Sequence, residues 1–117
     1  MTAQMKTLPA PMLPDAVGDV LYVHNLPDPT PGEVPPNQNA ATGDKVEFKV
    51  KTSTDNTWQG QLVLTAGDTG QPIVFKIPKH VFEKNLKPGA TADLHYVVTR
   101  IGQTPEQSAA LKVQLEL

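Results

Sequence analysis

Three histidines, His24, His80 and His95, are the residues best suited to acid–base chemistry or metal binding near neutral pH. None of them stands at a spacing typical of metal ligands. His80 falls in a short helical segment, and His95 is expected to face away from the core. We therefore expect solvated or edge histidines. The alternative is a zinc site, which would require all three histidines to converge at one end of the fold.

Other catalytic groups are missing or lack the surroundings they need. The chain contains no cysteine, which excludes thiol catalysis, disulfides and thiolate metal sites. Ser53 and Ser108 are not in the strained turn that exposes a nucleophilic serine. The glycine-containing run 67–70 joins two expected strands instead of opening a helix, so it is not typical of a phosphate site. We expect no catalytic residue, no metal and no cofactor.

Segment 27–43 holds the candidate binding residues. It is rich in Pro, Asn, Gly and Ala, and a loop of this length is unusual inside a compact domain unless it binds something. The candidates are Asp28, Glu33, Asn37, Gln38 and Asn39. The carboxylates here and upstream match no calcium-loop spacing, which favours plain surface acidity. The plainer interpretation of the whole segment is a connection or disorder.

The elements that would position these residues are strands. Residues 45–51 alternate between apolar and polar side chains, which places Val46, Phe48 and Val50 on one buried face. Further strands are expected at residues 19–24, 57–65, 73–77, 90–101 and 108–117, with one short helical turn within 79–86. Trp58 shares a face with Leu62 and Leu64. It is expected to anchor the core between two sheets, the alternative being a rim aromatic that stacks on a sugar or a partner.

These strands predict an all-β sandwich in one domain of residues 15–117, with 27–43 as a long irregular loop. Eight of the twelve prolines lie among the first 36 residues. Since proline lacks a ladder donor, residues 1–14 are expected to form an extended proline-rich arm along a sheet edge.

Several local patterns resemble bacterial immunoglobulin-like domains of the large repetitive surface or adhesin type. They are the runs 8–11 and 14–18, the strand opening at 42–46 with Trp58 on the next strand, the runs 70–72 and 75–78, the stretch 96–100, and the closing strand from 108. The resemblance implies an immunoglobulin-like antiparallel β-sandwich of about seven strands. Tyr96 resembles the corner tyrosine of such sandwiches. The resemblance brings no catalytic residues.

Composition narrows the function classes. The net charge is −2 and the two signs are interspersed, which indicates no nucleic-acid or membrane-surface partner. No run approaches the ~20 apolar residues of a membrane helix, and no secretory signal is recognisable. The resemblance, however, suggests a secreted or cell-surface location. We expect a monomeric, non-enzymatic module for protein recognition or adhesin-type structure. The alternatives are a soluble inhibitor or assembly factor acting through 27–43 and, less favoured, a small metal-dependent enzyme.

Overall fold

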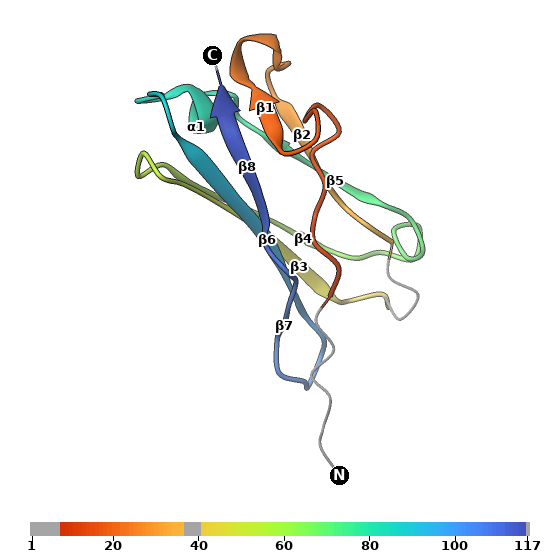
Figure 1. Cartoon of the computed structure of the whole chain (residues 1–117). Helices are drawn as coiled ribbons and strands as arrows, with labels where there is room; N and C mark the ends of the chain where they lie inside the picture. The colour runs from red at the N-terminus through yellow and green to blue at the C-terminus, as the bar shows by residue number, and fades with distance from the viewer. Residues whose placement is uncertain (1–7, 37–40, 117) are drawn as a thin grey trace.

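The structure, a computed structural model, describes residues 8–36 and 41–116 and consists of two facing sheets (Figure 1). The larger sheet has the order β1 (Val20–Tyr22), β8 (Leu111–Glu116), β6 (Thr91–Thr99), β3 (Lys45–Thr52) and β4 (Thr57–Val63), with β7 (Glu106–Gln107) also paired to β6. The smaller sheet pairs β2 (Thr30–Val34) with β5 (Ile73–Ile77). The predicted all-β sandwich is confirmed.

The alternation in β3 produces the buried face as predicted. Val46, Phe48 and Val50 are 2%, 0% and 2% exposed. Phe48 lies opposite Tyr96 on β6, and its ring packs against Phe75 of the smaller sheet with centroids 5.3 Å apart. The core is therefore made of side chains that both sheets direct inward.

The end of the sandwich that carries α1 (His80–Glu83) is closed by hydrogen bonds. The Asn56 side-chain amide donates to the carbonyl oxygens of Val81 at 2.9 Å and Lys84 at 2.7 Å. Phe82 is fully buried beneath this contact. The predicted short helical turn within 79–86 is confirmed, and it ends at Glu83, because Lys84 already has extended backbone and Asn85 takes a positive φ of 59°. A second single turn, η1 (Val23–Asn25), follows β1.

Segment 27–43 is not one irregular loop, which corrects the prediction. Residues 30–34 form β2 and pair in full with β5. Pro31 and Gly32 hid the strand pattern in the sequence. Gly32 is needed because a Cβ there would lie 2.8 Å from the Ile77 side chain and 2.9 Å from that of Phe48. The Phe48 ring of the larger sheet thus occupies the space left where β2 has no side chain.

The larger sheet is not wholly antiparallel, contrary to the prediction. β1 runs parallel to β8, with Leu21 opposite Leu115, and both side chains are buried. The described residues form eight strands in total.

The described part of the predicted arm is extended and lies against both sheets. Leu8 forms a parallel bridge with Ser108, and Met12 forms an antiparallel bridge with Glu33 on β2. Leu13 is only 6% exposed and belongs to the core. The predicted domain boundary after residue 14 is therefore not a structural boundary. Residues 1–7 of the arm lie outside the described residues.

In the part of the chain that the structure describes, no helix has the length and apolar character needed to cross a membrane.

Candidate functional site

The predicted binding residues do not gather in one place. Asp28 is exposed near α1, where its Oδ1 accepts the Lys79 backbone N–H at 3.2 Å. Glu33 lies within β2, where its backbone exchanges two 2.8 Å hydrogen bonds with Met12. The remaining candidates, Asn37, Gln38 and Asn39, fall outside the described residues.

The histidines are carried by three different elements. His24 is exposed on η1, and His80 is exposed on α1. His95 lies on the outer face of β6, opposite Lys49 of β3. Among residues 8–36 and 41–116, no three His, Cys, Asp or Glu side chains are grouped so that they could hold a metal ion.

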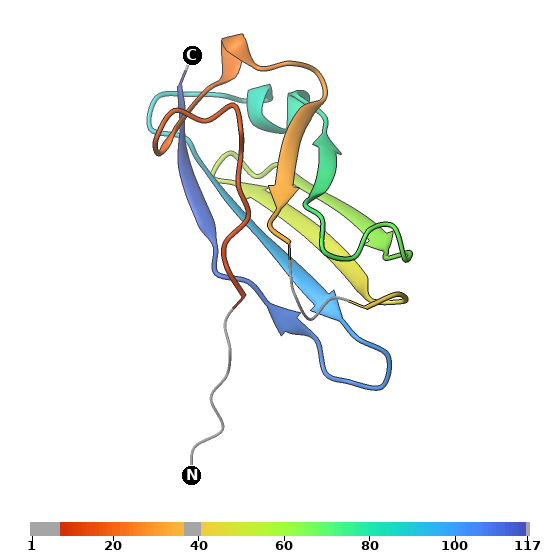
Figure 2. The same ribbon diagram turned by 90° about the vertical axis from the view of Figure 1, so that its right-hand side faces the viewer.

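Several loops lie at the end of the sandwich opposite α1 (Figure 2). We call this region the loop end, and it comprises residues 35–36, 41–44, 64–72 and 100–105. Two of its loops touch at Gly43. A Cβ built on Gly43 would lie 3.0 Å from Ile101 Cδ1, and Gly43 has φ +95°, a conformation that favours glycine. Ile101 nevertheless remains 82% exposed. The loop end thus presents a large apolar side chain to solvent.

Charged side chains link the same loops to the strands. Asp44 is 3% exposed, and its Oδ2 accepts the Ala41 N–H at 3.0 Å. Arg100 Nε lies 3.7 Å from Asp44 Oδ2, and another guanidinium nitrogen lies 3.7 Å from Glu106 Oε1. Both distances are long for charge-assisted hydrogen bonds. Within the described residues, the buried Nε of Arg100 has no hydrogen-bond partner.

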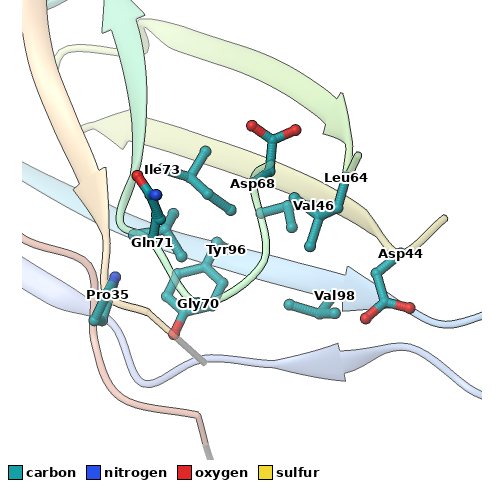
Figure 3. A pocket seen from close by; sticks show the side chains of 11 residues that line it. Pro35, Asp44, Val46, Leu64, Asp68, Gly70, Gln71, Ile73, Tyr96 and Val98 are labelled. Atoms are coloured by element: carbon teal, nitrogen blue, oxygen red, sulfur yellow. The ribbon is translucent and has the colours of Figure 1, made fainter. Parts of the chain in front are cut away.

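A small hollow opens between the sheets at this end (Figure 3). Its walls are mostly apolar, and Tyr96 directs its hydroxyl toward Gly70 and Pro35 at the mouth. Burial of the phenol raises the pKa of Tyr96. The volume is about 20 Å³, close to that of one water molecule and far below the several hundred Å³ of a metabolite pocket. The hollow is therefore too small for a substrate.

The loop that borders this hollow is ordered by Asp68. Its Oδ2 accepts both the backbone N–H and the hydroxyl of Thr65, each at 2.9 Å. The backbone hydrogen bond, and then that from the hydroxyl, lowers the pKa of Asp68. A carboxylate thus stays ionised at the rim of the loop end and holds the turn that leads into β5.

A larger, open hollow of about 560 Å³ lies beside Arg100. Lys45, Arg100, Ile101 and Pro105 are among the residues that line it. This surface combines two cations with apolar side chains, an arrangement suited to contact with another macromolecule. The described part of it offers no paired nucleophile and base for catalysis.

The sequence prediction missed Asp44, Arg100 and Ile101. It placed Arg100 and Ile101 in a strand ending at residue 101, whereas β6 ends at Thr99. Two residues in the sequence could have indicated the end of this strand. They are Gly102, which takes φ +75° in the turn, and the nearby Pro105. These two residues indicate that the loop begins earlier than the apolar alternation suggests.

No protein-family model matches this chain, and neither the curated proteins nor the solved structures contain a significant match to it.

Proposed function

We propose that this chain is a non-enzymatic β-sandwich module that recognises another protein through its loop end. The observation that carries the proposal is the open hollow where the loops at 43 and 101 meet. It joins an 82% exposed isoleucine to Arg100, and protein interfaces have apolar cores and are enriched in arginine.

The small volume of the interior hollow supports a surface contact over capture of a small molecule. The larger hollow is open, so its occupant would be a protruding side chain or loop of a partner. The resemblance to immunoglobulin-like modules of surface and adhesin-type proteins suggests the same class of function, with the sandwich as a carrier for exposed loops. We accordingly include a secreted or cell-surface setting in the proposal.

The alternative is an inhibitor or assembly factor acting through 27–43, and it is now limited to the residues of this segment outside β2. Residues 30–34 are a strand of the smaller sheet, and Thr30 and Val34 are buried in it. Deleting the whole segment would therefore damage the fold. Single substitutions at the loop end therefore test both the recognition module and the inhibitor or assembly factor better than a deletion does.

The test compares two substitutions of exposed apolar residues. The immobilised chain is used to capture a partner, and the purified partner is then titrated against Ile101→Lys and Val17→Lys. Val17 is 66% exposed but lies near β1, away from the loop end. We expect Ile101→Lys to weaken binding at least about tenfold, or roughly 1.4 kcal/mol, and Val17→Lys to leave it unchanged. Equal affinity for both variants, or no captured protein, would count against the proposal.

A further inference from the structure

The outer edge of β4 is the longest strand edge in the described residues that nothing protects. β4 is seven residues long and ends the larger sheet (Figure 2). Its sequence, residues 57–63, contains neither a charged residue nor a proline. The other edge strands of the described residues differ. β1 has only three residues and β7 only two, β2 contains Pro31, and β5 carries Lys76 and is flanked by Pro72 and Pro78. Short length, lysine and proline are the usual means of blunting an edge.

The backbone groups that face outward on β4 can be identified from its two ends. Leu64 exchanges hydrogen bonds with the segment before β3, donating to Asp44 O and accepting from Gly43 N–H, each at 2.8 Å. Asn56 O accepts the Thr52 N–H at 2.9 Å. Even-numbered positions therefore point their N–H and C=O groups toward β3. Since antiparallel strands alternate, the odd-numbered positions of β4 point theirs outward.

The sequence of β4 is self-complementary about Gly60. Antiparallel pairing of two copies centred there would place Gln59 opposite Gln61, Trp58 opposite Leu62, and Thr57 opposite Val63. The first and third of these pairs join odd positions, whose backbone groups face outward, so each exchanges two hydrogen bonds. The second joins two apolar side chains on the inner face. No charge is placed opposite a like charge.

The centre of this arrangement also fits sterically. The two Gly60 residues would form a pair without mutual hydrogen bonds, where strands approach most closely. The Trp58 ring folds across the strand at Gly60, where a Cβ would lie 2.6 Å from the ring. Glycine is needed at this position because it leaves room for the ring.

We infer that two copies of this chain associate through β4, in antiparallel register about Gly60, to form one continuous sheet. The contact is isologous, with the same surface on both partners, and it closes as a two-fold dimer. It replaces the monomer that the sequence suggested, and it is independent of the loop end, because it uses a different surface. The occupant of the edge is thus a second copy of this chain.

Association is tested by sedimentation across a concentration series up to about 1 mM, which detects weak dimers. We expect the average mass to rise from one chain toward two. Gln61→Pro removes an outward N–H and no hydrogen bond to β3, so it should remain monomeric with an unchanged circular dichroism spectrum. Gln61→Thr keeps the N–H and should still dimerise. A wild-type chain that stays monomeric, or a folded Gln61→Pro variant that associates like the wild type, would overturn the inference.

The register is tested with cysteines introduced into this cysteine-free chain, which does not depend on the proline variant folding. Gln59→Cys and Gln61→Cys chains are mixed with glutathione disulfide as the oxidant. Directly paired residues have Cα atoms about 5.5 Å apart, within disulfide reach, whereas identical positions in this register lie on a diagonal at about 7–8 Å. We expect cross-linked dimers several-fold more abundant in the mixture than with either variant alone. Equal cross-linking in all three samples would contradict the register.

Discussion

The two ends of the sandwich are closed in different ways. At the α1 end, Asn56 makes direct hydrogen bonds of 2.9 Å and 2.7 Å to two carbonyl groups, and Phe82 is fully buried beneath them. At the loop end, Arg100 reaches two carboxylates only at 3.7 Å, and Ile101 is exposed.

This difference separates the contacts that stabilise the fold from the exposed groups that the proposed recognition would use. Short hydrogen bonds over a buried aromatic ring stabilise the α1 end, where the exposed side chains of α1 are the polar His80 and Glu83. The loop end has longer ionic contacts and an exposed apolar side chain, which contribute less to stability and are available for binding. We therefore expect substitutions at the α1 end to change the free energy of unfolding, and substitutions at the loop end to change it much less.

The largest contrast is expected between two apolar truncations. Phe82→Ala should lower the free energy of unfolding by about 3–5 kcal/mol, because a fully buried ring leaves a cavity. Ile101→Ala should change it by less than about 0.5 kcal/mol, because this side chain is mostly in solvent. Urea denaturation measures both values. Similar losses at the two sites would remove the distinction between the ends.

The next effect is the loss of the Asn56 side-chain contacts. Asn56→Ala should cost about 1–3 kcal/mol, because the Val81 and Lys84 carbonyl groups lose their donor. Hydrogen exchange at the amides of 82–84 should accelerate in parallel. Gln59→Ala, on the outer face of β4, is the control and should leave exchange at α1 unchanged. Unaltered exchange in the Asn56 variant would show that α1 is held by packing alone.

A smaller effect is expected from the ion pair at the loop end. Glu106→Gln should cost about 0.2–1 kcal/mol in dilute buffer, because both partners are partly exposed and the pair is long. Thermal unfolding in buffer and in about 1 M NaCl should show the difference shrinking, since salt screens exposed charges. A cost that persists in high salt would indicate a tighter contact.

The smallest effect is the titration of Asp68, followed by the NMR shifts of its carboxyl group and of the Thr65 amide. Hydrogen bonds from Thr65 lower the pKa of Asp68, so the midpoint should fall below 3.8. A carboxyl group with a lowered pKa stabilises the folded chain above its unfolded pKa, and this contribution disappears as pH falls through the folded pKa. In Asp68→Asn the Thr65 amide should no longer show this titration. A midpoint at or above 3.8 would mean that the turn is not held by the carboxylate.

The strand faces were largely predictable from the sequence, whereas the site was not. Val46, Phe48 and Val50 follow strict alternation, so one period identifies both the strand and its buried face. β2 was hidden, because Gly32 meets a packing requirement set by Phe48 and Ile77 that lies far away in sequence. The pairing of Asp44 with Arg100 likewise depends on loops 56 residues apart, which no local pattern relates.

The parallel pairing of β1 with β8 has a mechanical consequence. Val20 lies opposite Gln114, and Tyr22 lies opposite Glu116, so the first and last strands of the larger sheet run in the same direction. A force that pulls the two ends of the chain apart drags these strands past each other along their length. Their hydrogen bonds then carry the load together and do not open one after another. Single-molecule extension from the two ends should therefore meet greater resistance than extension applied across the β3–β4 hairpin, which opens bond by bond.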